Sequence, residues 1–599
     1  MPEPLVFVRR AAVAASVLLV LPAWAAAQEP PPADSCDTGL ITALFLDNQS
    51  IFDTTDPDLD RRFRWAYGAA NALHFQTKER VIRRELLFGV GDCYDPFMLE
   101  ETERLLRGYD FIGRVDVRGE RQPDGTYYAF VETQDEWSTR LDMRVRFDNG
   151  FEIEGAAINE ENLLGTGQTL GLFYIARDVT RDYGLSYFTP QLAGTRWDLM
   201  TAFGQSRAGT FVREQVVYPF VGEVSRWAGR QSFSREDQFF DYTAGDDPEL
   251  RADHVLLPTR EKFFDMAVMR RVGRRGNSAL VGAGISFQEL DYPGPVQVAP
   301  DGDFDGRTPA DSAVEALVLQ QRERLSSIRL SALVGYRSVW WTERRGLDNL
   351  RGEQDVRLGA EVGLALGRSI PSLEQDDDTN ITLTIYTAVA AGPALFAARS
   401  RADVRRDLAA PAGADEWEDL YGEGELFAYF KPRPDSRHTL LFRAAAAGAW
   451  NTRTPFQLTL GGERALRGYD IERYPGGRRL VLTLEERFYL GWPFRDVFDN
   501  GITLFADAGR IWPGDAPFGG DSGWRASAGL GLRQNFPAGS RTTYRLDVAW
   551  PFEAGTGFGD FRLLLSIGES VGLSATQGDL QLLRSRPEGV AGQLFQFRN

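Results

Sequence analysis

The sequence predicts a mostly β protein in which a transmembrane antiparallel β-barrel follows one small α+β domain. Beyond residue 27 the chain has no run of 18 apolar residues, and its mean hydropathy of −0.30 also argues against transmembrane helices. Its 61 glycines, 39 phenylalanines, 19 tyrosines and 13 tryptophans fall in short segments of alternating apolar and polar residues, a pattern typical of barrel strands. Composition alone also fits a large soluble β protein, so the choice between a barrel and a soluble protein rests on the individual segments.

The first 27 residues have the features of a secretory signal peptide. Arg9 and Arg10 form a positive start, and residues 11–21 form an apolar core too short to span a bilayer. Three alanines at 25–27 provide a cleavage site. The sequence therefore predicts an exported protein.

Residues 28–136 are predicted to form the small α+β domain. Asp95 and Pro96 begin its second helix as a cap and a first helical residue, and Gly108 ends that helix. Residues 56–74 form an insertion, between the first strand and the first helix, whose sequence favours a helix. The predicted order is strand, helix, helix, strand and strand, at residues 40–52, 78–88, 96–108, 111–117 and 126–133.

The chain has two cysteines, Cys36 and Cys93, and both fall in this domain. In an oxidising compartment a disulfide between them would tie the first strand to the turn between the helices. The sequence leaves open whether the bond forms, because its geometry cannot be read from spacing.

Residues 137–570 are predicted to form the barrel, and residues 571–599 a C-terminal tail. In the segment around residue 546, Tyr544 and Val548 would face lipid while Arg545 and Asp547 face the lumen. Two interpretations of this tail remain open. It is either an extension into the periplasm, or the last barrel strand lies later in the sequence than residues 561–570. The five clearest strands are 478–490, 500–512, 524–535, 542–550 and 561–570. Trp492, Trp512, Trp524 and Trp550 lie near strand ends, where an aromatic girdle belongs.

Two motifs near the C-terminal end suggest an internal ion pair. Residues 460–470 contain three glycines that let the chain bend sharply and present a lone arginine. About forty residues later, an aspartate on the lumen face of a strand needs a partner, and that arginine is the candidate. A surface turn and an unrelated lumen aspartate are the alternative. The motif residues are Arg467, Gly468 and Tyr469 on the loop and Phe505, Asp507 and Gly509 on the strand.

In this order and spacing, the two motifs resemble the BamA/TamA-type outer-membrane assembly superfamily, which also includes bacterial surface antigens and two-partner-secretion transporters. In that family the loop folds back into the barrel, which implies a pair between Arg467 and Asp507. The N-terminal domain resembles a single POTRA domain. The resemblance also implies a barrel of about 16 strands.

The resemblance implies a location in the outer membrane of a Gram-negative bacterium, with the N-terminal domain in the periplasm. The expected function is the assembly, insertion or translocation of proteins. Expected partners are the lipid bilayer, periplasmic chaperones, and unfolded β-barrel or secreted clients captured by strand addition. A seam between strands 140–147 and 561–570 would template the clients. The alternatives are a dedicated two-partner-type channel for one passenger and a surface antigen barrel that transports nothing.

No catalytic site or cofactor is predicted. His74, His254 and His438 lie in no metal-ligand spacing, and no nucleophile elbow or phosphate-binding loop stands out. The net charge of −18 argues against a nucleic-acid partner.

One acidic stretch imitates the opening of a calcium loop through Asp301, Asp303 and Asp305. Its twelfth position is Ser312, so the bidentate glutamate is missing. A solvated acidic loop is the alternative interpretation.

Overall fold

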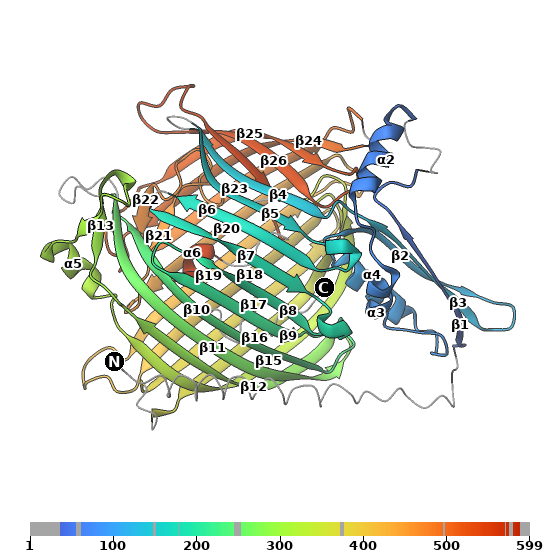
Figure 1. Ribbon diagram of the computed structural model, residues 1–599, viewed down its shortest axis with the longest axis horizontal. Helices are drawn as coiled ribbons and strands as arrows, with labels where there is room; N and C mark the ends of the chain where they lie inside the picture. The colour runs from blue at the N-terminus through green and yellow to red at the C-terminus, as the bar shows by residue number, and fades with distance from the viewer. Residues whose placement is uncertain are drawn as a thin grey trace.

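The computed structural model describes residues 36, 38–54, 61–147, 151–177, 179–244, 253–371, 376–494, 497–568, 571–573 and 579–586. The predicted signal segment lies outside these residues. Figure 1 shows a large barrel with the N-terminal domain at one end. We call this the covered end, and the opposite end the far end.

The N-terminal domain is a three-stranded sheet with helices. Its strand order is β1-β3-β2, with β1 parallel and β2 antiparallel to β3. The Asp95 carboxylate accepts a 3.0 Å hydrogen bond from the Phe97 amide and so caps α4 at its predicted start. A disulfide joins Cys36 to Cys93, with Cα atoms 5.6 Å apart. The elements are β1 (Ile41–Gln49), η2 (Arg61–Phe63), α2 (Arg64–Leu73), α3 (Glu79–Glu85), α4 (Pro96–Arg107), β2 (Ile112–Arg121) and β3 (Tyr127–Asp135).

The barrel closes by pairing each strand with the next and the last strand, β27, with the first, β4. Its strands are β4 (Thr139–Phe147), β5 (Phe151–Glu160), β6 (Thr169–Arg177), β7 (Thr180–Thr189), β8 (Asp198–Gln205), β9 (Thr210–Tyr218), β10 (Trp227–Thr243), β11 (His254–Arg274), β12 (Asn277–Asp291), β15 (Leu325–Arg345), β16 (Glu353–Ser369), β17 (Asp378–Ala391), β18 (Ala394–Asp407), β19 (Trp417–Phe430), β20 (His438–Trp450), β23 (Arg478–Tyr489), β24 (Asp499–Trp512), β25 (Arg525–Asn535), β26 (Thr543–Pro551) and β27 (Arg562–Ile567).

These are 20 strands over the described residues, so the expectation of about 16 was wrong. The difference lies between β11 and β20, where every alternating run is part of the wall. In β15, for example, Leu330, Val334 and Trp340 are all more than half exposed on one face. Apolar side chains exposed at a period of two need lipid beside them, so such a run cannot be an outer loop.

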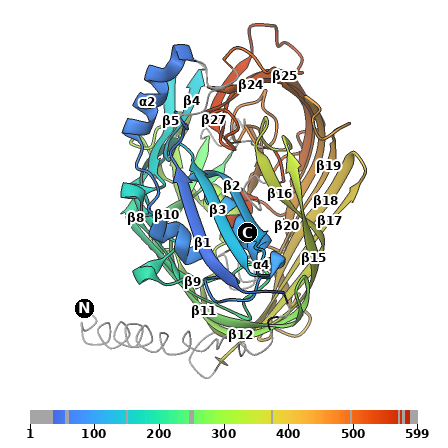
Figure 2. The ribbon, with the colours of Figure 1, turned by 90° about the vertical axis from the view of Figure 1, so that its right-hand side faces the viewer.

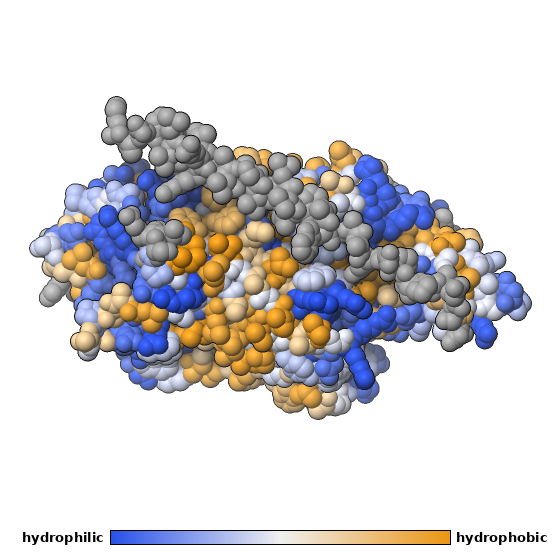
Figure 3. Space-filling view, turned by 90° about the horizontal axis from the view of Figure 1, so that it is seen from below, coloured by the Kyte–Doolittle hydropathy of each residue, from blue (hydrophilic) through white to orange (hydrophobic). Residues whose placement is uncertain are grey.

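The barrel surface carries a broad apolar region between polar ends, as Figure 3 shows for one face. On β26, Arg545 and Asp547 are buried on the lumen side, as the alternation predicts. Among the described residues, no helix is long and apolar enough to cross a membrane.

Short elements occupy the connections. Between β12 and β15 at the far end lie β13 (Gln297–Ala299), η5 (Pro300–Gly302), β14 (Thr308–Pro309) and α5 (Ser312–Leu319). Turns at the covered end contain η3 (Leu163–Gly165) and η4 (Leu192–Gly194). Inside the barrel lie β21 (Leu458–Leu460), β22 (Tyr474–Gly476) and α6 (Leu580–Leu583).

Candidate functional site

Residues 451–477, between β20 and β23, fold into the barrel and are called the lumen loop here. Within it, β21 and β22 pair as a short antiparallel hairpin. Leu458, Leu460 and Leu466 are fully buried and cluster with wall residues such as Val481. Burial of each leucine contributes about 1.5–3 kcal/mol, so the loop is held as a packed part of the barrel.

Glycines allow the loop backbone to reach the wall. Gly461 and Gly462 have φ angles of 138° and 88°, in a region that side chains disfavour. At Gly468, an added Cβ would lie 2.7 Å from the Ser527 Cβ and 2.8 Å from the Pro551 nitrogen. The backbone at Gly468 therefore lies directly against β25 and β26, which positions the neighbouring Arg467.

Arg467 is the centre of the site. Its Nε and Nη2 donate hydrogen bonds of 2.8 and 2.9 Å to the two carboxylate oxygens of Asp507. Its Nη1 donates a 2.6 Å bond to Glu485, and its guanidinium carbon lies 3.5 Å from the centre of the Phe505 ring. The arginine is 1% exposed, so this forked pairing is removed from bulk water.

The pair belongs to a larger buried network on the lumen face of the last strands. Asp547 on β26 lies 3.7 Å from the Arg467 guanidinium and accepts a hydrogen bond from Arg533 on β25. Arg487 donates bonds of 2.9 and 2.7 Å to Glu485. The network thus joins the loop to four consecutive strands, β23 to β26.

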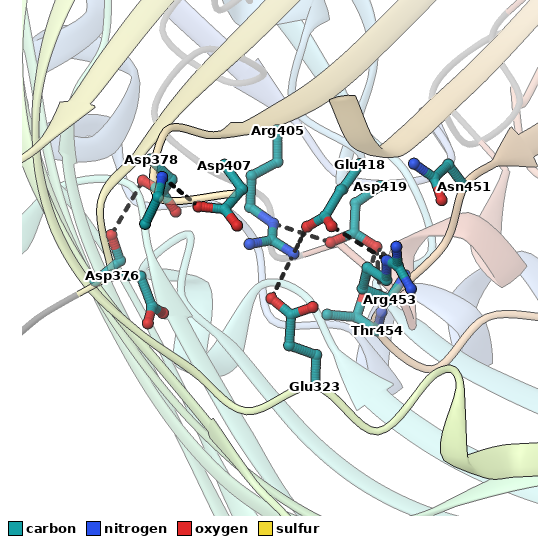
Figure 4. A network of polar contacts seen from close by, with 12 residues as sticks. Glu323, Asp376, Asp378, Arg405, Asp407, Glu418, Asp419, Asn451, Arg453 and Thr454 are labelled. Carbon is teal, nitrogen blue, oxygen red and sulfur yellow. Dashed lines mark hydrogen bonds and ion pairs between the residues drawn. The ribbon is translucent and has the colours of Figure 1, made fainter. Parts of the chain in front are cut away.

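A second polar network anchors the start of the lumen loop at β18 and β19 (Figure 4). Arg405 donates bonds of 2.9 Å to both Glu323 and Glu418 and a bond of 3.0 Å to Asp419. Asp419 in turn accepts a 2.7 Å bond from the backbone amide of Arg453. The start of the lumen loop is therefore tied to the wall, as its centre is at Arg467.

The N-terminal domain docks on the covered end, in front of the barrel in Figure 2. Arg541, in the turn between β25 and β26, donates bonds of 2.8 and 3.0 Å to the carbonyls of Tyr109 and Ile112. Its backbone amide donates to the Glu136 carboxylate at 3.1 Å. Burial raises the pKa of the Glu136 carboxyl, and the charge of Arg541 offsets only part of that rise.

The domain also contacts more distant turns of the barrel. The Glu101 carboxylate accepts a 2.7 Å bond from the Glu223 amide in the turn between β9 and β10. Gln191, between β7 and β8, donates a 3.0 Å bond to the Val81 carbonyl. These contacts spread the docked domain across the covered end.

The described part of the tail runs inside the barrel, which neither sequence interpretation anticipated. The Val571 carbonyl accepts a 2.6 Å bond from Arg487. Further on, Gln581 accepts a 2.8 Å bond from the Thr459 amide on the lumen loop, and Leu582 is fully buried. Arg586 pairs with Asp403 at 2.7 Å. The tail therefore reaches from the last strand, β27, to the loop and to β18.

The structure brings together the two motifs that the sequence singled out. Phe505 stacks beneath the guanidinium, and the Tyr469 hydroxyl donates a 3.2 Å bond to the Ala526 carbonyl. Gly509 has Leu460 and Leu466 against it. Sequence reasoning did not identify Glu485 and Arg533 as partners, although alternation along their strands marks both as lumen-facing.

The acidic stretch at the far end is a turn around Asp303. Its carboxylate accepts a 3.0 Å bond from the Asp305 amide. Over the described residues, no group of three His, Cys, Asp or Glu is arranged to hold a metal ion.

The family model described as the Omp85 superfamily domain matches residues 425–571, which contain the lumen loop and its partner strands. Among solved structures, BamA from Haemophilus ducreyi lacking POTRA domains 1–3 is 13% identical, with a TM-score of 0.36 over 88% of this chain and 84% of that one. CdiB from Escherichia coli is 11% identical, with a TM-score of 0.41 over 88% of this chain and 76% of that one. No curated protein matches the chain.

Proposed function

We propose that the protein belongs to the Omp85 superfamily, whose domain model matches residues 425–571, and that it inserts or translocates other proteins at the outer membrane. The observation that carries the proposal is the buried Arg467–Asp507 pair, which lies within the matched segment. The pair fixes the lumen loop against the strands next to the seam. The protein would act by positioning chains, without a catalytic group.

The route for a client is the seam between β27 and β4. β27 has six residues and is the shortest of the 20 barrel strands in the described structure. Fewer ladder hydrogen bonds make such a strand easier to separate from its neighbour. The lumen itself is occupied by the loop and the tail, which supports a route through the wall.

The N-terminal domain is a POTRA-like receptor in the periplasm. Its sheet ends in two edge strands, β1 and β2, and an unpaired edge can accept an extended chain through main-chain hydrogen bonds. Such recognition depends little on side chains and suits unfolded clients that chaperones deliver. Because the domain is docked on the covered end, a captured client would arrive close to the seam.

Depletion of the protein, followed by quantitative proteomics of purified outer membranes and culture medium, tests this function. A broad fall in outer-membrane barrels is the expected result and indicates a general insertion factor. Loss of one large secreted protein with all barrels intact would instead indicate a dedicated two-partner-type channel. Unchanged membranes and medium would contradict both and favour a surface antigen that transports nothing.

A further inference from the structure

We propose that α2 is a membrane-surface helix, which lies in the head-group region of the phospholipid leaflet at the covered end of the barrel. The helix belongs to the insertion that precedes α3 in the N-terminal domain. Its described contacts do not include the residues of the lumen network. Three observations about α2 support the proposal: the apolar residues on its outward face, its position on the barrel rim, and the basic residues beside it.

The outward face of α2 is apolar, and none of the described residues covers it. Trp65, Ala69, Ala72 and Leu73 follow the helical spacing of one face and are all exposed. Trp65 is 75% exposed and Leu73 is 74% exposed. A tryptophan and a leucine at this exposure are unfavourable in water and favourable at a bilayer interface.

The opposite face fixes the helix to the barrel rim. Tyr67 is buried, and its ring centre lies 4.7 Å from that of Phe52. Asn71 both donates to and accepts from the backbone of Phe52, at 2.8 and 3.1 Å. Just before the helix, the Phe63 ring lies 5.1 Å from that of Phe494, in the turn between β23 and β24.

The rim at this point already belongs to the membrane interface. Trp492 and Phe494 of the same turn are 67% and 48% exposed, where an aromatic girdle would lie. Figures 1 and 2 show α2 at the outer edge of the barrel outline, running across the long axis of the molecule. A helix in that position lies parallel to a membrane that surrounds the barrel.

The charge of the segment completes the match to a lipid surface. Residues 61–73, which form η2 and α2, contain Arg61, Arg62 and Arg64 and no acidic residue, in a chain whose net charge is −18 and directly after four aspartates at 53–60. Arg62 and Arg64 are exposed. Basic residues beside an apolar helix face are the pattern of interfacial helices that bind anionic phospholipids. The occupant is therefore the bilayer, and not a soluble protein.

The test uses the full chain in lipid nanodiscs. Because Cys36 and Cys93 are bonded, Ala69→Cys introduces a single free thiol for an environment-sensitive fluorophore. We expect blue-shifted emission and quenching by lipids that carry a shallow doxyl group. Asp124→Cys, at the exposed tip of the β2–β3 hairpin, is the matched control and should show neither. Emission at residue 69 as polar as that at residue 124 would overturn the proposal.

Further variants separate the two parts of the surface. Trp65→Ser with Leu73→Ser should lower the quenching at residue 69 at least about twofold, while the barrel keeps its folded electrophoretic mobility. Arg62→Glu with Arg64→Glu should lower quenching in discs that contain phosphatidylglycerol and not in discs of phosphatidylcholine alone. Quenching that neither pair of changes affects would also overturn the proposal.

Discussion

The lumen loop and the C-terminal tail both occupy the barrel interior, but they are held there in different ways. The loop continues into wall strands at both ends and is fixed by Arg467, which is 1% exposed among carboxylates. The described part of the tail follows β27 and is held by side-chain contacts: Arg586 pairs with Asp403 and Glu423, Asp579 pairs with Arg479, and Gln581 bonds to the lumen loop. A segment that continues into wall strands on both sides is part of the barrel, whereas the tail is held in the lumen by side-chain contacts that can open locally.

Arg467→Ala should have the largest effect on the loop. The change leaves Asp507 and Glu485 buried without their shared partner, which costs about 3–5 kcal/mol. We expect a barrel that still inserts but unfolds at lower urea concentration and has impaired activity. Urea titration of the purified barrel, followed by its electrophoretic mobility, measures the loss.

Arg510→Ala is the matched control for this change. Arg510 pairs with Asp521 in a solvent-exposed position, at 2.6 Å. Water replaces such a partner readily, so the urea midpoint should match that of the unmodified protein. Full activity of Arg467→Ala would refute the role assigned to the loop.

Gly468→Ala should have the next largest effect on stability, because it introduces a steric overlap and changes no charge. The added methyl group meets the Ser527 Cβ of β25 and backbone atoms of β26 at distances below 3.0 Å, so the loop must move away from the wall. Overpacking of this kind costs about 1–3 kcal/mol. The urea midpoint should fall, while Gly520→Ala, which has no atom within 4 Å of the new Cβ, should leave it unchanged.

Tyr469→Phe should have a smaller effect. It removes one hydrogen bond to the Ala526 carbonyl and keeps the packed ring, so the free energy of unfolding should fall by about 0.5–1.5 kcal/mol. Tyr336→Phe removes an exposed hydroxyl that contacts Asn277 and serves as the control. Equal urea midpoints for the two variants would show that the Tyr469 hydroxyl does not anchor the loop.

The contrast between the lumen loop and the tail also explains which contacts the sequence could predict and which it could not. Alternation with a period of two places Asp507 inside the barrel, and the glycine-rich loop identifies Arg467 as its partner, so this pair is visible in local patterns. Glu485 and Arg533 join it through the register of four strands, which no local pattern specifies. The described part of the tail has one four-residue helix, and the tail sequence has no long amphipathic pattern, so only tertiary contacts place it in the lumen.

Arg586→Ala should have the smallest effect on stability. Its main consequence should be that the tail is released from the lumen. Asp403 keeps its 2.9 Å pair with Arg401. Glu423 loses its contacts with both Arg586 and Asp579 when the tail leaves, but water then enters beside it, so neither carboxylate is left buried without a partner. The tail can detach without unfolding the wall, so the free energy of unfolding should change by less than about 0.5 kcal/mol.

Release of the tail should instead free space in the occupied lumen and raise the single-channel conductance of the barrel in planar lipid bilayers. Arg584→Ala is the control, because Arg584 is exposed and stacks on Phe240 at 5.1 Å without an ion pair to the wall. A loss of stability as large as that of Arg467→Ala would show that the tail is as integral as the loop. Unchanged conductance with unchanged stability would show that the remaining contacts, such as Gln581 with Thr459, suffice to hold the tail in the lumen.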